Sequence, residues 1–267
     1  MLKNLSSVLK MGKKKYKTGI VLSGGGTRGF AHLGALQALN DNGIFPDIVS
    51  GVSAGAIAGS LYCDGKKPNK ILNILTEHKI FHYLDLTIPT QGLVEMKGFE
   101  KKLKKTLDAQ FFEDLEIPLM VFAVDINNAK LVKFDKGDLV TAVRASSSIP
   151  VVFPPVKIKD TYYSDGGVIE NFPIDPLEDI CEEIIGVNVN PIGYQENFSN
   201  LFKLAERTFH IFIRTRIIER KDRCSLFIEP KGLDKFGLMD ISSANEIYKL
   251  GYKETIKVLK ENKRIKK

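Results

Sequence analysis

The chain has 267 residues, of which 43% are hydrophobic and 27% are charged, and these values are ordinary for one globular domain. No apolar run reaches the ~18 residues that a membrane-spanning helix needs, and the three widely spaced cysteines give neither a disulfide framework nor a metal-binding spacing. The N-terminal residues lack the apolar segment of a secretory signal, so we expect a cytoplasmic protein.

The net charge of +7 is concentrated at the two ends of the chain. Residues 1–17 contain six lysines and no acidic residue, and residues 253–267 contain seven basic residues against two acidic ones. The chain between them, 18–252, therefore has a net charge of −4. Because this part has no basic stripe interleaved with aromatic residues, we expect no nucleic-acid partner. The basic ends fit either solvated tails or peripheral contact with an anionic membrane.

The first part of the chain predicts a parallel α/β unit. An apolar strand at 17–23 runs into a glycine-rich loop at 24–29, and helical spacing follows over 30–39. A second apolar strand at 48–49 leads to a further helix near Ala56. Strands that alternate with helices in this way are typical of a parallel sheet covered by helices.

The stretch Gly51-Val52-Ser53-Ala54-Gly55 has the pattern of a nucleophile elbow, in which a serine stands on a sharp turn between a strand and a helix. Side chains in place of Gly51 and Gly55 would meet the strand and the helix, so glycine is expected at both positions. Ser53 would lie at a helix N-terminus, which favours a developing negative charge. A simple packing turn fits the pentapeptide equally well.

Two interpretations fit the glycine loop before the first helix. Gly24, Gly26 and Gly29 have the spacing of a dinucleotide-binding fingerprint, with Asp47 near the distance expected of the ribose-binding acid. Asp47, however, precedes its strand instead of ending it. The loop could equally turn its N–H groups toward the oxyanion of a tetrahedral acyl intermediate, and the elbow one strand later favours this interpretation. Arg28 could steady the loop, attract an anionic head group or be a plain surface residue.

The rest of the chain continues with strands and helices. Helical segments begin near Pro68 and Gly98, and the apolar stretch 81–93 between them could be a lid, an acyl-binding wall or ordinary core. Residues 191–240 contain no motif that indicates a function. We expect strands at 119–124, 131–134, 156–158, 162–163, 184–189 and 226–228, and helices at 137–147 and 242–261.

A serine nucleophile needs a neighbouring base. The histidines of the chain are His32, His78, His82 and His210. Only His210 follows the order of a Ser–acid–His triad, and its apolar setting without a glycine turn argues against that role. Asp165, before two glycines at the end of a predicted strand, is the better candidate, although Asp-Gly-Gly is also an ordinary turn sequence. An aspartate with its usual pKa of ~3.9 is a weak base, so the site must be dry.

Three motifs occur in the order Gly24-Gly25-Gly26-Thr27-Arg28-Gly29, Gly51-Val52-Ser53-Ala54-Gly55 and Asp165-Gly166-Gly167. Supporting segments are Arg144-Ala145-Ser146-Ser147-Ser148-Ile149-Pro150, Phe153-Pro154-Pro155 and Asn171-Phe172-Pro173. Together they resemble the patatin-like phospholipase family, in its bacterial type, and the resemblance is best over 18–190.

The resemblance implies a three-layer α/β/α fold with a mostly parallel central sheet, and a Ser–Asp dyad that hydrolyses phospholipids or other lipid esters through an acyl-enzyme. By position, Ser53 is the nucleophile and Asp165 the base, and neither a metal nor an organic cofactor is implied. The oxyanion hole falls on Gly24, Gly25, Gly26 and Ala54. Supporting motif positions are Arg28, Gly29, Gly51, Gly55, Gly166 and Gly167.

With this resemblance the chain divides into a basic N-terminal segment (1–16), a catalytic domain (17–260) and a basic C-terminal tail (261–267). Three alternatives stay open. A lipid acyltransferase or thioesterase would use the same dyad, a nucleotide-binding protein would use the glycine loop, and a lipid-binding or regulatory protein would catalyse nothing. The oligomeric state is not indicated.

Overall fold

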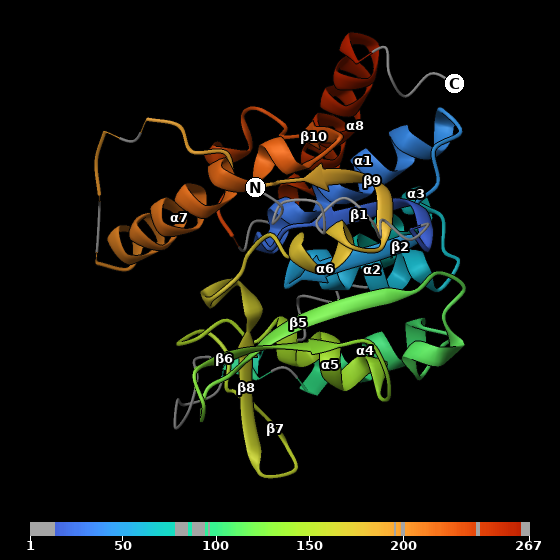
Figure 1. The fold of residues 1–267 in the computed structure, drawn as a ribbon. Helices are drawn as coiled ribbons and strands as arrows, with labels where there is room; N and C mark the ends of the chain where they lie inside the picture. Colours follow the sequence, from blue (N-terminus) through green and yellow to red (C-terminus); the bar gives the residue numbers. More distant parts are fainter. Residues whose placement is uncertain are drawn as a thin grey trace, which may run out of the picture.

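The computed structural model describes residues 14–77, 85–86, 94–95, 97–194, 196–198, 201–238 and 241–262. Two short strands, β3 (Asp85–Leu86) and β4 (Val94–Glu95), pair with each other, and eight strands form the main sheet (Figure 1). In chain order these eight are β1 (Tyr16–Leu22), β2 (Ile48–Val52), β5 (Leu119–Asp125), β6 (Lys130–Phe134), β7 (Val156–Ile158), β8 (Thr161–Asp165), β9 (Cys181–Val187) and β10 (Leu226–Ile228).

The sheet has the order β10-β9-β1-β2-β5-β8-β7, and β6 also pairs with β5. Strands β10, β9, β1, β2 and β5 run parallel to one another, as strands joined by crossover helices do. The strands β6, β7 and β8 are added as antiparallel hairpins. The predicted α/β class with a mostly parallel sheet is confirmed.

The register of β5 brings two strand ends together. Val52, the last residue of β2, lies opposite Phe122, and Asp165, the last residue of β8, lies opposite Ala123. Because β6 pairs with 121–125 of β5, which overlap the positions that pair with β2 and with β8, β2 and β8 share the other edge and end at neighbouring positions on it. Residues that follow β2 therefore meet residues at the end of β8.

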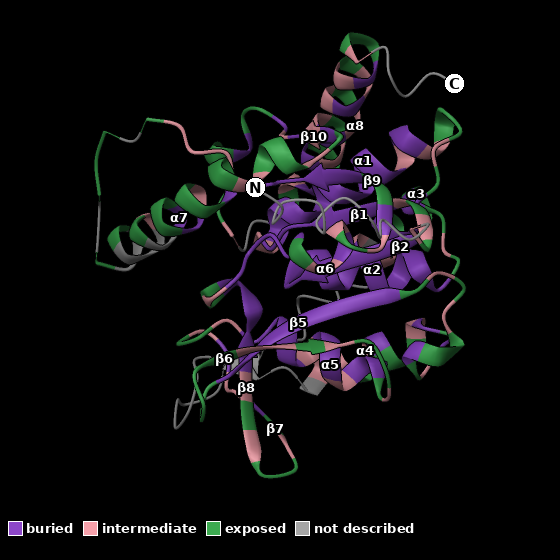
Figure 2. Ribbon diagram, in the orientation of Figure 1, coloured by how far each residue is buried: buried purple, intermediate pink, exposed green. Residues whose placement is uncertain are grey.

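Helices cover both faces of the sheet and form the outer two of three layers. Side chains alternate along β1, so that Ile20 and Leu22 belong to one apolar cluster and Val21 belongs to the other. The central strands β2 and β5 are buried on both faces, whereas the hairpin strands β6, β7 and β8 are partly exposed (Figure 2). One face is covered by α1 (Phe30–Asp41), α2 (Ala54–Cys63), α3 (Pro68–Glu77), α4 (Lys97–Thr106), α5 (Leu139–Ser146) and α8 (Ala244–Glu261), and the other by α6 (Asp175–Glu178) and α7 (Leu201–Arg220).

The 20-residue helix α7 is an element that hydrophobic periodicity did not predict. Its buried residues Ile213 and Ile217 pack against the sheet, but Leu204, Ile211 and Ile218 are exposed on its other side. Apolar residues therefore lie around the helix and mask the single stripe by which an amphipathic helix is recognised.

Both chain ends lie largely outside the described residues. Of the predicted N-terminal segment 1–16, only 14–16 are described, and of the predicted tail 261–267 only 261 and 262. Most of the apolar stretch 81–93 also lies outside them. Among the helices that the structure describes, none is long and apolar enough to cross a membrane.

Candidate active site

Ser53 stands on a sharp turn between β2 and α2, with φ 53° and ψ −122°, a conformation that side-chain-bearing residues rarely adopt. The flanking glycines make this turn possible. A Cβ on Gly51 would lie 2.7 Å from the carbonyl oxygen of Gly55, and a Cβ on Gly55 would lie 2.2 Å from that of Leu22. The chain forms the elbow that the pentapeptide predicts, and its serine is buried at the N-terminus of α2.

We expect Ser53→Gly to resist unfolding better than Ser53→Ala, by about 1 kcal/mol, because glycine relieves the positive φ while both variants lose the hydroxyl. At Ser60, inside α2, the order should reverse, since glycine costs about 1 kcal/mol more than alanine within a helix. Urea unfolding of the four variants measures both differences. Equal stabilities of the two Ser53 variants would mean that this turn stores no strain.

The hydroxyl of Ser53 donates a hydrogen bond of 2.5 Å to Oδ2 of Asp165. The other carboxylate oxygen, Oδ1, accepts the N–H of Gly167 at 2.7 Å, which fixes the carboxylate on the turn after β8. Both Ser53 and Asp165 are 6% exposed. The arrangement holds a hydroxyl proton directly against a buried carboxylate.

Burial raises the pKa of Asp165 to about 6, and the hydrogen bonds from Ser53 and Gly167 partly oppose that rise. The carboxylate is therefore ionised at neutral pH and is a stronger base than an aspartate in water. This meets the requirement of a dry site for an aspartate base.

The C-terminal end of α5 holds both members of this pair. Ser146 Oγ accepts the N–H of Ser53 at 2.9 Å and donates to the carbonyl oxygen of Phe122 at 2.6 Å. Two residues later, the carbonyl oxygen of Ser148 accepts the N–H of Asp165 at 2.9 Å. Sequence reasoning found this serine run only as a supporting segment, because these contacts join parts of the chain that are far apart in sequence.

The glycine loop presents free N–H groups beside Ser53, although not the one on Gly24. The N–H group of Gly24 donates to the carbonyl oxygen of Asn171 at 3.3 Å. Gly24 was expected to donate to the oxyanion, and this hydrogen bond differs from that expectation. For the N–H groups of Gly25, Gly26 and Ala54, no acceptor occurs among the residues that the structure describes. Three of the four expected donors are thus available to a bound oxyanion.

Two buried asparagines position the loop through its first carbonyl group. Asn190 Nδ2 donates to the carbonyl oxygen of Gly24 at 2.6 Å, and Asn171 Nδ2 lies 3.5 Å from the same oxygen. Asn171 was identified from the sequence only as part of a supporting segment, and Asn190 was not a candidate. A polar residue at the end of the predicted strand 184–189 was the available signal for Asn190, which lies three residues after the end of β9.

Arg28 is 4% exposed and donates from Nε to the carbonyl oxygen of Phe236 at 2.9 Å. It therefore steadies the loop, and the surface and head-group interpretations are wrong because the side chain is buried. The segment that contains Phe236 and Leu238 also packs against Gly26. The φ of Gly26 is +54°, and a Cβ added there would lie 2.4 Å from the carbonyl oxygen of Leu238.

The dinucleotide interpretation of the loop lacks its acid. Asp47 lies before β2, and its carboxylate accepts the N–H of Thr18 near the start of β1 at 2.8 Å. That is the amino edge of the sheet, whereas the glycine loop follows the carboxyl end of β1. The ribose-binding position is therefore not filled by Asp47.

No histidine contacts Ser53 among the described residues, which exclude His78 and His82. His32 Nε2 bonds to the carbonyl oxygen of Ser23 at 2.8 Å, and burial lowers its pKa to about 4. His210 is buried in α7, and burial also lowers its pKa to about 4. Within the same residues, no group of three or more His, Cys, Asp or Glu could hold a metal ion.

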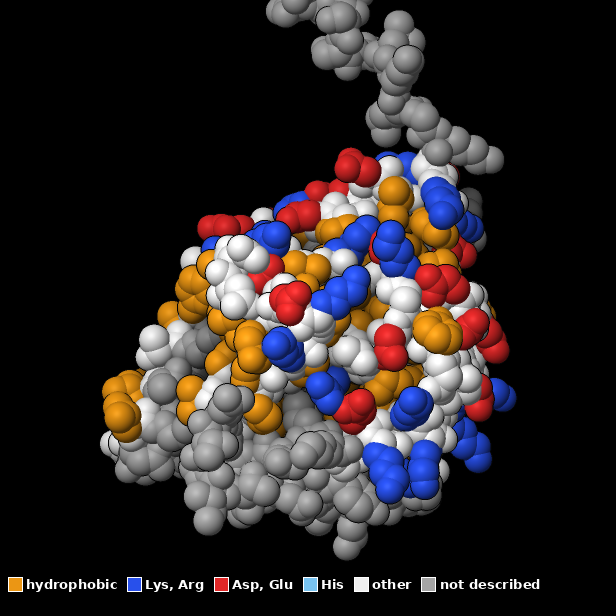
Figure 3. Space-filling model, turned by 90° about the horizontal axis from the view of Figure 1, so that it is seen from below, with side chains coloured by type: hydrophobic (Ala, Val, Ile, Leu, Met, Phe, Trp, Pro, Cys, Tyr) orange, Lys and Arg blue, Asp and Glu red, His pale blue; other side chains and the backbone are white. Residues whose placement is uncertain are grey.

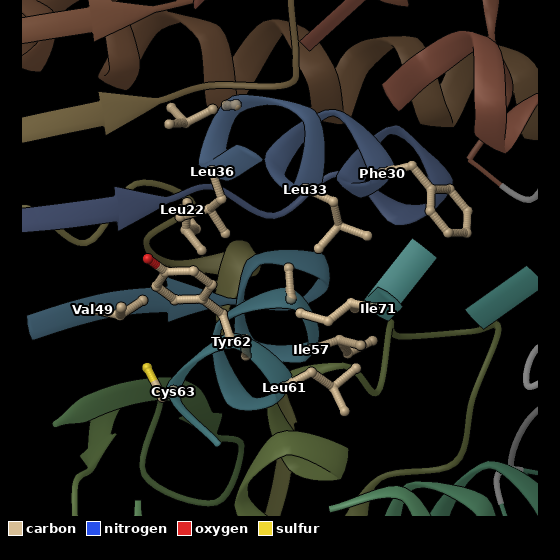
Figure 4. Packing of buried hydrophobic residues seen from close by; sticks show 14 of the residues in the cluster. Leu22, Phe30, Leu33, Leu36, Val49, Ile57, Leu61, Tyr62, Cys63 and Ile71 are labelled. Atoms are coloured by element: carbon tan, nitrogen blue, oxygen red, sulfur yellow. The ribbon is translucent and has the colours of Figure 1, made fainter. Parts of the chain in front are cut away.

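An apolar cavity that opens to solvent extends from Ser53 between the helices of one layer. Leu33 of α1 and Ile57 of α2 point toward the space between these helices (Figure 4). The only polar side chains in its wall, among the described residues, are Thr27, Ser53 and Ser147. The apolar wall includes Phe30, Leu33, Ile57, Ala58, Leu75, Phe99, Ile149 and Phe153.

A family model described as patatin-like phospholipase matches residues 20–178. An uncharacterized NTE family protein of Mycobacterium bovis is 29% identical over 182 residues, which cover 67% of this chain and 51% of that protein. Lysophospholipase NTE1 of Candida albicans is 25% identical over 270 residues, which cover 88% of this chain and 19% of that protein. The chain thus spans about half the length, or less, of these curated relatives.

The crystal structure of VipD from Legionella pneumophila superimposes with a TM-score of 0.57 at 16% sequence identity. The match covers 97% of this chain and 72% of VipD. At this identity the likeness is one of fold.

Proposed function

We propose, from the premise that this chain belongs to the patatin-like phospholipase family, that it hydrolyses lipid esters with Ser53 as nucleophile and Asp165 as general base. The observation that carries the proposal is the 2.5 Å hydrogen bond from Ser53 Oγ to Asp165 Oδ2 beside an apolar cavity. The relative named as a lysophospholipase supports the same class of substrate.

In the first half of the reaction, Asp165 takes the hydroxyl proton as Ser53 Oγ attacks the ester carbonyl carbon. The tetrahedral intermediate collapses to an acyl-enzyme, and the alcohol leaves with the proton that Asp165 held. In the second half, the oxygen of a water molecule attacks the acyl carbon while Asp165 takes a proton from that water. Ser53 regains a proton, and the fatty acid leaves. A pKa of about 6 suits a group that both accepts and returns a proton.

The oxyanion of each tetrahedral intermediate would accept the N–H groups of Gly25, Gly26 and Ala54. Support comes from the absence of other acceptors for these groups in the described part of the chain and from the N-terminus of α2 beside Ser53. Donors held in place before the reaction stabilise this charge without reorganising, and each is worth ~10²–10³ in rate.

The apolar cavity would receive one acyl chain. Its wall offers no charged side chain to a substrate among the described residues, so it suits a hydrocarbon chain and leaves the polar head group at the mouth. A lysophospholipid, which has one acyl chain, fills such a site without a second apolar pocket.

We expect the protein to release fatty acid from lysophosphatidylcholine and nitrophenol from a short-chain nitrophenyl ester. A fluorophosphonate probe should form a covalent adduct at Ser53, which mass spectrometry of the labelled peptide locates. Products formed with added lysolipid or alcohol distinguish hydrolysis from acyl transfer. If neither ester is cleaved and Ser53 is not labelled, the hydrolase is refuted and a non-catalytic lipid-binding protein is favoured.

A further inference from the structure

Helix α7 presents a row of apolar side chains to solvent. Leu201, Leu204, Ile211 and Ile218 are between 45% and 80% exposed. At 100° per residue these positions share about one third of the helix circumference, together with the exposed Thr208, Thr215 and Glu219. We call this row the outer face of α7. It lies opposite Ile213 and Ile217, which pack on the sheet.

Helix α7 lies on the active-site side of the molecule. Arg216 donates to the carbonyl oxygen of Ile169 at 2.9 Å, and Arg220 pairs with Glu170 at 2.7 Å, so α7 packs on the segment that follows the Asp165 turn. Figure 1 shows α7 projecting from the body on the left, the side toward which β5 runs. Figure 3 shows hydrophobic side chains along the same side of the molecule.

Arginines flank the outer face on both sides. By helical position, Arg207 and Arg214 border one side and Arg216 borders the other. Arg214 is paired with Glu229, whereas Arg207 and Arg216 donate to the carbonyl oxygens of Gly193 and Ile169. Neither of these two arginines forms a salt bridge with another described residue, although Glu170 lies near enough to Arg216 to interact with its charge. The guanidinium of Arg216 also lies 5.2 Å from the ring centroid of Phe212, which is itself exposed.

We propose that the outer face of α7 binds the surface of an anionic lipid bilayer. The apolar side chains would enter the boundary between head groups and acyl chains, and the flanking arginines would meet lipid phosphates. The inference rests on the proposed function, since a lipid substrate would then be held on the side of the molecule that carries Ser53.

Flotation with vesicles of phosphatidylcholine and phosphatidylglycerol tests the proposal. The protein carries Ser53→Ala so that the vesicles stay intact. Adding Leu204→Ser, Ile211→Ser and Ile218→Ser should weaken binding by about tenfold or more, because three exposed apolar side chains are lost. Added salt should weaken binding of the unsubstituted outer face. Phe45→Ser is the matched control, since Phe45 is 60% exposed in the loop before β2, at the amino edge of the sheet.

Circular dichroism and urea unfolding confirm that each variant is folded. Equal flotation of the triple variant and the Phe45→Ser control would overturn the proposal, as would absence of flotation with the unsubstituted outer face. Light scattering measures the oligomeric state in the same experiment. If the protein is a dimer and the triple substitution dissociates it, the outer face binds a second copy of the chain and the proposal is overturned. Because Ser53→Ala protein is used, a native protein without hydrolase activity would refute the proposed function and leave the binding result intact.

Discussion

Ser53→Ala should lower ester hydrolysis by about 10³-fold or more while the protein stays folded. The substitution removes the attacking oxygen, whereas the free N–H groups and the apolar cavity remain and can still bind the ester. Initial rates on a nitrophenyl ester and on lysophosphatidylcholine measure the loss. The KM should change less than kcat, since binding does not depend on the nucleophile.

Ser60→Ala is the matched control for this experiment. Ser60 is a buried serine on α2, seven residues after Ser53, and its hydroxyl donates to the carbonyl oxygen of Ile57 within the same helix. Its removal should leave activity nearly unchanged. A Ser53→Ala protein that keeps the rate of this control would exclude Ser53 as the nucleophile.

Asp165→Asn should lower kcat by about 10²–10⁴-fold, because an amide has the shape of the carboxylate but cannot accept the hydroxyl proton of Ser53. In the native protein, kcat/KM should rise with pH up to about 6, the pKa of Asp165, and then reach a plateau, because the reactive form is the ionised carboxylate. Below the pKa of Asp165, kcat/KM should fall about tenfold for each pH unit. A native profile that is flat from pH 5 to 8 would contradict this assignment.

The same variant should be more stable than the native protein at neutral pH. Folding raises the pKa of Asp165 from 3.8 to about 6, so the folded state binds this proton more tightly than the unfolded chain does. Ionised Asp165 therefore destabilises the folded state above about pH 6, and this cost disappears as the pH falls through 6 toward 3.8. We expect Asp165→Asn to gain about 1–3 kcal/mol in the free energy of unfolding near pH 7.5 and little near pH 4.

Asp125→Asn should lower the free energy of unfolding at neutral pH, the opposite of the effect expected for Asp165→Asn. Asp125, at the end of β5, accepts hydrogen bonds from the side chain and N–H of Asn128, which lower its pKa. Its ionised form stabilises the folded state above its unfolded pKa, and that contribution is lost as the pH falls through the folded value. Its replacement should therefore reduce stability at neutral pH. If Asp165→Asn and Asp125→Asn both raised the free energy of unfolding at neutral pH, the two carboxylates would not differ in environment as described.

Local chemistry made the core of the site predictable. Gly51 and Gly55 are needed because only a glycine fits the contacts of the elbow, and that requirement is visible in five consecutive residues. The Asp165 turn is likewise local, with Gly167 donating to a carboxylate two residues earlier. The parallel sheet followed from alternating apolar runs and helical spacing.

The supporting contacts were not predictable, since they join residues more than 90 positions apart. Ser146 reaches Ser53 across 93 residues, and Asn190 reaches Gly24 across 166. The burial of Arg28 also depends on a distant segment at Phe236. Helix α7 escaped prediction for another reason, because its outer face carries apolar residues where a surface helix normally carries polar ones.

By itself the sequence determined the fold class and the elbow with Ser53 at its tip, and it favoured Asp165 over a histidine as the proposed base, because each rests on short-range geometry or on an ordered set of motifs. Only the tertiary structure decided that Ser53 and Asp165 meet across 112 residues, through two strands that end at neighbouring positions of β5. It also left the N–H groups of Gly25 and Gly26 without an acceptor among the described residues, and it buried the carboxylate of Asp165 so that its pKa rises. The physical reason is that desolvation and long-range hydrogen bonds exist only once the chain is packed.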